Sequence, residues 1–232
     1  MSQLLLDLKP EQVPSLDNFV AGINAELVDR LRTLAEPNCF DLVYVWGDPG
    51  CGRSHLLAAT ALLAQPRRPA MVIAGDAVAA ELPLVPGGLL AIDDVELLSP
   101  QAQIALFRAF NSARLVGLAL LLSGPLPPLR LGLREDLRTR IGQSLIFEVK
   151  PLDDEQKSAA LRRHALQRGM KVDDSLVHYL MRHGRRDLPS LMAVLDGLDR
   201  ASLEQQRPAT LPLLKEVMQL KLETDKDETG SV

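Results

Sequence analysis

The feature that most constrains the fold is a glycine-rich loop placed between a strand-like run and a helix-like run. Residues 42–46 (Leu-Val-Tyr-Val-Trp) are apolar β-formers, and residues 56–63 consist mainly of leucine and alanine, which favour helix. The loop between them fits the P-loop pattern of Gly, four residues, Gly, Lys and Ser or Thr, except that Arg53 takes the lysine position. A strand, a P-loop and a helix in this order predict an α/β domain built on a parallel sheet.

The residue types in this loop are those that phosphate binding requires. Glycines let the backbone N–H groups curl around phosphate oxygens in conformations that a side chain would block. The following helix directs the positive end of its dipole at the same anion, and the hydroxyl of Ser54 is suited to Mg²⁺. The alternative is a glycine-rich turn that binds nothing. We predict a nucleotide-binding loop made of Gly47, Asp48, Pro49, Gly50, Cys51, Gly52, Arg53, Ser54 and His55.

A second motif fits the first, because an apolar run over residues 89–92 ends in two carboxylates, Asp93 and Asp94. An uninterrupted apolar run is typical of a parallel strand buried on both faces. Charges then emerge at its carboxyl end, where ligands bind in open α/β sheets. In this Walker B interpretation Asp93 binds Mg²⁺ and Asp94 positions the attacking water. The alternative is a polar strand end that caps the next element.

Arginine at position 53 bears on catalysis. The segment that carries both motifs contains no lysine, since every lysine is Lys9 or lies from Lys150 onward, so the replacement also fits a general exchange of lysine for arginine. The chemistry still differs, because guanidinium is a bulky planar fork whereas the P-loop lysine is a compact charge. We therefore hypothesise tight nucleotide binding with slow or absent intrinsic hydrolysis.

Composition excludes several other classes of function. The net charge is −4, from 26 basic and 30 acidic residues, and aromatic residues make up 3% of the chain. This balance argues against strong direct binding of nucleic acid or of a membrane surface. No apolar run is long enough to span a membrane, and the start has no signal-sequence pattern, so we expect a cytoplasmic protein. Cys39 and Cys51 form neither a metal-ligand spacing nor a disulfide framework.

The order of the predicted elements divides the chain into an α/β part followed by an all-helical part. Residues 1–14 are expected to be an N-terminal peptide and linker, 15–150 the nucleotide-binding domain, 151–222 a small helical domain and 223–232 a disordered tail. Strands are predicted at 42–46, 70–74, 88–92, 117–122 and 145–149, and helices near 24–35, 53–64, 100–113, 134–141, 153–168, 173–183, 187–206 and 210–222.

An α/β P-loop domain with a parallel sheet and flanking helices, followed by a small all-helical lid, resembles an AAA+ module. In that superfamily an arginine finger precedes the last strand of the sheet, which places Arg140 in this role, with Arg138 as a neighbour that shares or lacks it. Arg186, at the start of the third lid helix, corresponds to the "sensor 2" arginine that touches phosphate. The alternative for each is an ordinary solvated arginine.

Further motifs resemble the ATPase domain of the bacterial initiator family DnaA, over residues 15–222. Residues 15–25 are similar to the segment that runs past the adenine in that family, which assigns Asn18, Phe19 and Val20 to nucleotide binding. The pair Asp93-Asp94, the stretch 136–141 and Arg186-Asp187-Leu188 also match DnaA-type positions.

The departures from DnaA resemble the Hda family of DnaA-related regulatory inactivators. No helix-turn-helix domain follows residue 222, and only 75–87 separates two strands between which initiators insert a DNA-contacting helix. Arginine at the P-loop lysine position is shared with Hda. The N-terminal residues Gln3, Leu4, Leu6 and Leu8 resemble the Hda peptide that docks on the β sliding clamp, although Asp7 stands where proline is frequent.

This resemblance implies a nucleotide-bound AAA+ regulator that binds the β sliding clamp and stimulates hydrolysis of the ATP bound to DnaA, which prevents re-initiation of chromosome replication. Arg140 acts in trans on DnaA, and the chain's own ADP or ATP, with Mg²⁺, has a structural role. Homo-oligomers of several forms are compatible with AAA+ packing. Two alternatives stay open: a self-standing P-loop ATPase or kinase, and a helicase-loader-type adaptor. At the sensor-1 position only Ser123 is available, which also favours slow intrinsic hydrolysis.

Overall fold

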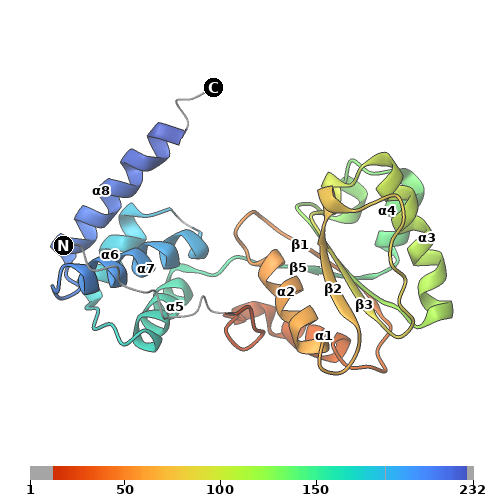
Figure 1. Ribbon diagram of the computed structural model, residues 1–232, viewed down its shortest axis with the longest axis horizontal. Helices are drawn as coiled ribbons and strands as arrows, with labels where there is room; N and C mark the ends of the chain where they lie inside the picture. The colour runs from red at the N-terminus through yellow and green to blue at the C-terminus, as the bar shows by residue number, and fades with distance from the viewer. Residues whose placement is uncertain (1–12, 186, 229–232) are drawn as a thin grey trace. The chain divides into compact units, whose positions relative to one another are not determined.

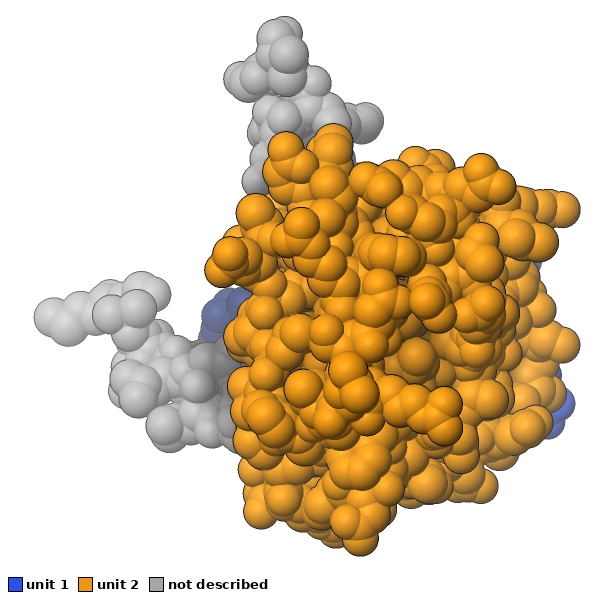
Figure 2. Space-filling model, turned by 90° about the vertical axis from the view of Figure 1, so that its right-hand side faces the viewer, with its two compact units in different colours: residues 1–9, 152–232 blue, residues 10–151 orange. Residues whose placement is uncertain are grey.

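The computed structural model of the protein describes residues 13–185 and 187–228. The chain forms two compact units, which meet in the sequence between Pro151 and Leu152 and are coloured separately in Figure 2. The first, residues 10–151, holds the sheet, and the second is all-helical in its described residues.

A five-stranded parallel sheet forms the centre of the first unit, in the order β2-β3-β4-β1-β5. β1, which leads into the P-loop, therefore lies between β4 and β5, two strands that come much later in the sequence. The prediction of a parallel sheet and of all five strands is confirmed, with ends that shift by one or two residues. The strands are β1 Leu42–Trp46, β2 Ala70–Ala74, β3 Leu89–Asp93, β4 Ala119–Gly124 and β5 Leu145–Glu148.

Helices cover both faces of this sheet, as Figure 1 shows. Alternate residues along β3 and β4 point to opposite faces: Leu90 and Ile92 pack towards α3 and α4, whereas Leu89 and Ala91 pack towards α1 and α2. Both faces are therefore buried, which explains the apolar runs in the sequence. The helices are α1 Ala25–Leu34, α2 Arg53–Ala64, α3 Pro100–Val116 and α4 Glu135–Gly142, with short 3₁₀ turns at Gly22–Asn24 (η1), Gly75–Ala77 (η2), Val95–Leu97 (η3) and Pro128–Arg130 (η4).

Local chemistry fixes the ends of these helices. The hydroxyl of Ser99 accepts a hydrogen bond from the N–H of Ala102, Pro100 occupies the first position of α3, and Gly117 ends the helix at φ 63°. The segment between β2 and β3 contains only the turn η2, so the predicted lack of an inserted α-helix is confirmed for this fully described stretch.

Arg68 holds the base of the sheet unit together from a buried position, with 5% of its surface exposed. Its guanidinium donates hydrogen bonds of 2.6–2.9 Å to four backbone carbonyls, and it lies 5.4 Å from the centre of the Phe40 ring. These carbonyls belong to two loops far apart in sequence, so one side chain joins them. They are those of Glu36, Cys39, Gly87 and Gly88.

The second unit consists of four helices around a leucine-rich core that includes Leu161, Leu180, Leu195 and Leu214. The four predicted lid helices are confirmed as α5 Asp154–Gln167, α6 Asp174–His183, α7 Leu188–Glu204 and α8 Leu211–Glu228. Three of them begin after an aspartate whose side chain accepts a backbone N–H, at Asp153, Asp173 and Asp187.

Helix α8 differs from the expectation at its end. It continues to Glu228, whereas disorder was expected from residue 223. The sequence over 223–228 is polar but contains neither glycine nor proline, so nothing in it stops the helix that Leu211 begins. Residues 229–232 lie outside the described part. Along the described chain, no helix has the length and apolar character needed to cross a membrane.

Candidate nucleotide site

The P-loop follows the carboxyl end of β1 and leads into α2, as the sequence indicates. Gly50 and Gly52 have φ angles of 80° and 102°, in the region that side chains rarely adopt. At Gly47 a different constraint applies, because an added Cβ would lie 2.6 Å from the carbonyl oxygen of Val149. Three of the loop's glycines are therefore required by its backbone path.

The start of α2 offers the groups that an anion needs. The first N–H groups of a helix have no acceptor inside it, and in α2 they belong to Arg53, Ser54 and His55. The side chain of Ser54 is exposed, whereas Cys51 is partly buried, and its burial raises the pKa of its thiol. Cys51 is thus a neutral small residue in the loop, while Asp48, Pro49 and Gly50 are exposed at its tip.

Arg53 folds back across the loop and binds the Walker B motif. Its Nη1 donates to the carbonyl oxygen of Gly47 at 2.7 Å, and its Nη2 donates to Oδ1 of Asp94 at 3.2 Å. Only 11% of the Arg53 side chain is exposed, against 35% for Asp94. The guanidinium therefore neutralises the carboxylate that was predicted to position the attacking water.

Ser123 connects the side chain of Asp93 to the backbone of Asp94. Its hydroxyl donates to Oδ1 of Asp93 and accepts the backbone N–H of Asp94 at 2.9 Å, and the residue is fully buried at the end of β4. Asp94 has φ 51°, a conformation rare for residues other than glycine. Because its hydrogen-bonding capacity is used within the protein, Ser123 orients Asp93 and Asp94 in this structure.

Two further carboxylates stand near this pair and were missed in the sequence. Burial and the neighbouring Asp93 raise the pKa of Asp94, Arg53 opposes them, and Asp76 adds to the rise. Burial also raises the pKa of Glu96, whose Oε2 is buried without a hydrogen-bond partner. Glu96 follows Asp94 by two residues, so the sequence alone could have placed it near the site. Asp76 follows β2 and comes near the site because β2 pairs in parallel with β3.

The segment predicted to pass the adenine packs against the start of α2. The ring of Phe19 lies against Gly52, 2.8 Å from where a Cβ would be, and stacks on the ring of His55 with centroids 6.0 Å apart. Asn18 uses its side chain locally, accepting the N–H of Ser15 and donating to the carbonyl of Val13, both at 3.1 Å. Val20 is half-buried, so Phe19 is the member of the trio that contacts the loop directly.

Helix α4 carries two arginines and a third precedes it, and their surroundings differ. Arg134, just before the helix, is paired with Asp136 at 2.8 Å, and Arg138 points to the carbonyl of Leu129 at 3.4 Å. Arg140 is exposed; its guanidinium lies 5.9 Å from the centre of the Phe107 ring and 3.5 Å from the side-chain oxygen of Gln143. Among the residues that the structure describes, Arg140 has no carboxylate partner.

Arg140 also lines an open pocket of about 820 Å³, together with Phe107, Asp136, Thr139 and Gln143. Phe107 was missed in the sequence, because nothing in α3 marks it as a neighbour of α4.

Arg186 and the peptide residues Gln3, Leu4, Leu6 and Leu8 lie outside the described residues. Asp187, next to Arg186, caps α7.

The arrangement can bind phosphate groups at the P-loop, with Ser54 and Asp93 as the candidate ligands of a magnesium ion. Glycines at the required positions, free helix N–H groups and an oriented carboxylate fit this combination. No group of three or more His, Cys, Asp or Glu side chains suited to a metal occurs in the described part of the chain. The fold and this site define the class of structure: an α/β P-loop fold of the AAA+ type, followed in the sequence by a helical unit.

Comparison with known proteins shows which proteins of this fold the chain is similar to. Residues 154–218 match the family model of the Hda lid domain. The fold is similar to domain III of DnaA from Thermotoga maritima, with a TM-score of 0.77, 16% identity and coverage of 90% of this chain and 97% of that one. It is also similar to a DnaA bound to AMPPCP and single-stranded DNA, with a TM-score of 0.65, 20% identity and coverage of 82% and 68%.

A branch migration motor, RuvB of Thermotoga maritima, shares the fold as well, with a TM-score of 0.69, 18% identity and coverage of 89% and 72%. These similarities establish the fold, and the match of residues 154–218 to the Hda lid domain adds a similarity to one family. The similarity to the Hda family is therefore confined to residues 154–218, and the chain as a whole has the fold of an AAA+ module.

Proposed function

We propose that the protein is a nucleotide-bound regulator that stimulates hydrolysis of DnaA-bound ATP and so prevents re-initiation of chromosome replication. The observation that carries the proposal is a contrast between two arginines. Arg53 is enclosed and paired with the chain's own Walker B carboxylate, whereas Arg140 is exposed and has no described carboxylate partner. The chain is thus better equipped to act on another protein's nucleotide than on its own.

The chain's own nucleotide, ADP or ATP with Mg²⁺, has a structural role in this proposal. The P-loop amides and Arg53 bind the phosphates, and Ser54 and Asp93 bind the metal, which neutralises phosphate charge when present. Asp94 must leave Arg53 before it can position a water, which makes intrinsic hydrolysis slow. A relative bound to AMPPCP has the same fold, which supports binding of an adenine nucleotide.

Arg140 acts in trans. A guanidinium brought to the γ-phosphate of a neighbour stabilises the charge that develops on the transferring group, an effect of about 10³–10⁵ in rate in GTPase systems. The contact with Phe107 is compatible with release, because exposed cation–π contacts are worth only about 0.5–1 kcal/mol.

The N-terminal peptide brings the protein to its place of action. Gln3 fills a polar pocket of the β sliding clamp, and Leu4, Leu6 and Leu8 bind its apolar groove. The protein acts in the cytoplasm, on clamps left on DNA after replication begins. Support comes from the resemblance of this peptide to that of the family and from the lid match.

The test follows DnaA-bound ATP, with this protein added, in the presence and absence of clamp loaded on DNA. Hydrolysis accelerated only with clamp, and lost in Arg140→Ala, is the expected result. Arg138→Ala is the matched control, since this arginine of the same helix points to η4, and it should retain most of the stimulation. A stimulation that survives Arg140→Ala would refute the role of the arginine.

The alternative is a self-standing P-loop ATPase or kinase. The observation in its favour is that Asp93 and Asp94 are both present at the end of β3. It predicts brisk ATP turnover by the purified chain without DnaA or clamp, whereas the regulator predicts slow turnover under the same conditions.

A further inference from the structure

One segment of the first unit concentrates positive charge in a chain that is negative overall. Residues 100–143 contain six arginines and two carboxylates, whereas the net charge of the whole chain is −4. The whole-chain balance, which argues against strong binding of nucleic acid, averages over this segment and an acidic remainder. The arginines are Arg108 and Arg114 of α3, Arg130 of η4, Arg134 just before α4, and Arg138 and Arg140 within α4.

The elements that carry these arginines are neighbours in the structure. Helices α3 and α4 pack on the same face of the sheet, as Figure 1 shows. The N–H of Arg134 donates to Oε1 of Gln103 at 3.0 Å, which joins the start of α4 to α3. Arg138 donates to the carbonyl of Leu129 at 3.4 Å, which joins α4 to η4. The arginines of the three elements therefore belong to one side of the unit.

Three of the arginines are available to an external anion. Arg108, Arg114 and Arg130 are exposed, and within the described residues none of them forms an ion pair. The two on α3 lie outside the buried stripe of that helix, which consists of alanine, leucine and phenylalanine. Arg140 is exposed as well, but it already has a role in the proposed function. We call the surface formed by Arg108, Arg114 and Arg130 the basic face.

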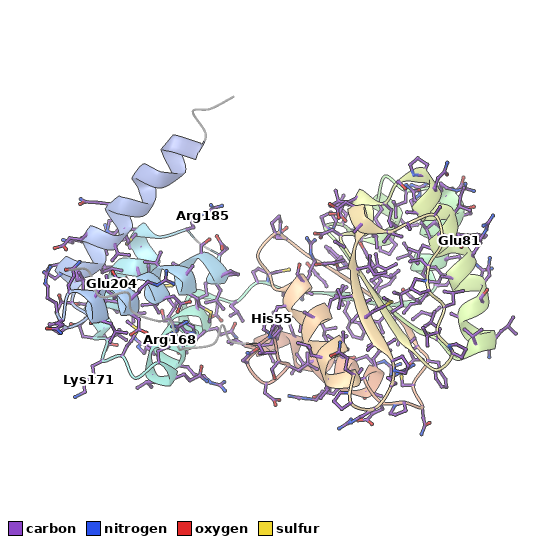
Figure 3. The ribbon with its side chains drawn as sticks, in the orientation of Figure 1. His55, Glu81, Arg168, Lys171, Arg185 and Glu204 are labelled. Carbon is purple, nitrogen blue, oxygen red and sulfur yellow. The ribbon has the colours of Figure 1, made fainter. Side chains whose placement is uncertain are left out.

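Few carboxylates offset the basic face. Asp136 is paired with Arg134, which leaves Glu135 as the other carboxylate of residues 100–143. A further exposed carboxylate is Glu81, labelled in Figure 3, on the segment between β2 and β3, which packs against the same core as α3. The basic groups outnumber these two, so the potential at this side is positive.

The chemistry of the basic face fits phosphate groups better than an acidic protein surface. A protein–protein interface has an apolar centre, but the large apolar residues exposed on α3, η4 and α4, all fully described, are single leucines on separate elements, Leu115 and Leu129. Arginine binds phosphate oxygens through its planar fork of N–H donors. Binding to the DNA backbone needs such contacts and requires no groups that read or stack on bases.

We propose that the basic face binds the phosphate backbone of duplex DNA. The binding is independent of base sequence and weak, with a dissociation constant of about 10⁻⁴–10⁻⁶ M at physiological salt, as is usual for non-specific contacts. Three phosphate contacts release counterions, so the logarithm of the binding constant falls with the logarithm of the salt concentration with a slope of about −3. This inference goes beyond the proposed function and does not depend on it, because neither DnaA nor the clamp takes part.

The experiment measures fluorescence anisotropy of a labelled duplex of about 20 base pairs, titrated with the full-length protein at several salt concentrations. The unmodified protein should bind with the slope given above. The double variant Arg108→Glu with Arg114→Glu should bind at least about 10-fold more weakly, with a slope reduced by about two. The matched control is Arg163→Glu with Arg182→Glu, which changes the net charge equally at exposed arginines of α5 and α6 and should bind DNA nearly as the unmodified protein does.

Arg108→Gln with Arg114→Gln serves as a milder pair, in case thermal unfolding shows that the charge-reversed protein does not fold, and it should reduce the slope by the same amount. No binding by the unmodified protein, or an equal loss in the control on α5 and α6, would overturn the inference. DNA binding that both α3 variants retain, with stimulation of DnaA lowered, would overturn it too and assign the basic face to an acidic protein partner.

Discussion

Replacing Arg53 by lysine should raise the chain's own ATP hydrolysis, because it frees Asp94. The Nη2–Oδ1 distance of 3.2 Å corresponds to a Coulomb attraction of about 5 kcal/mol at an effective dielectric constant of 20. Desolvation and the 35% exposure of Asp94 offset much of this attraction. We take a net value of about 1.4–2.7 kcal/mol, which corresponds to roughly 10–100-fold in rate.

The assay is single-turnover hydrolysis of labelled ATP by the purified protein, without DnaA and without clamp. Arg53→Lys should reach a rate about 10–100 times that of the unmodified protein, and the gain should vanish when Asp94→Asn is added. Arg67→Lys is the matched control, because Arg67 is exposed and paired with Glu36 at the other end of α2. Unchanged turnover in an Arg53→Lys protein that binds ATP tightly would refute the reasoning.

Three other predictions concern residues that support the site and the fold. Arg68→Met leaves four buried or partly buried carbonyls without their donor and should lower the free energy of unfolding by about 3–5 kcal/mol in urea titrations, so a loss below about 1 kcal/mol would contradict this account. Ser123→Ala removes the donor to Asp93 and should weaken Mg²⁺-dependent ADP binding roughly 10-fold while binding in EDTA stays the same; equal losses in both would point to general disruption. Partial burial raises the pKa of Asp187, but hydrogen bonds from Ser190 lower it further, so the net shift is downward. The cap therefore contributes its stability above the ordinary aspartate pKa and loses it as the pH falls through the folded pKa. Asp187→Ala should then cost about 1 kcal/mol at pH 7 and progressively less as the pH falls through the lowered folded pKa, and thermal unfolding over a series of falling pH values checks this.

Much of the fold could be predicted because its signals are local. The apolar run at 42–46, the glycines and the helix-forming residues after Ser54 are contiguous, and each favours one conformation. The end of α8 was misjudged for the opposite reason. Polar composition over 223–228 indicated disorder, but without a helix-breaking residue the helix continued.

The partners within the site could not be predicted, because they come from separate elements. Arg53 and Asp94 are 41 positions apart, and only the parallel pairing of strands brings the loop after β1 near the end of β3. Phe107 meets Arg140 through the packing of α3 on α4, which no motif records. Residue type therefore identified the chemical groups of the site, whereas the tertiary structure determined which of them are already paired.

The most direct test of the central claim asks whose nucleotide is hydrolysed. Labelled ATP is preloaded either on DnaA or on this protein, the two are mixed with clamp loaded on DNA, and release of phosphate is followed. A trans-acting regulator predicts rapid release of label from DnaA, lost in Arg140→Ala, and slow release of label from this protein. Rapid release from this protein, with the DnaA-bound label unaffected, would contradict the account.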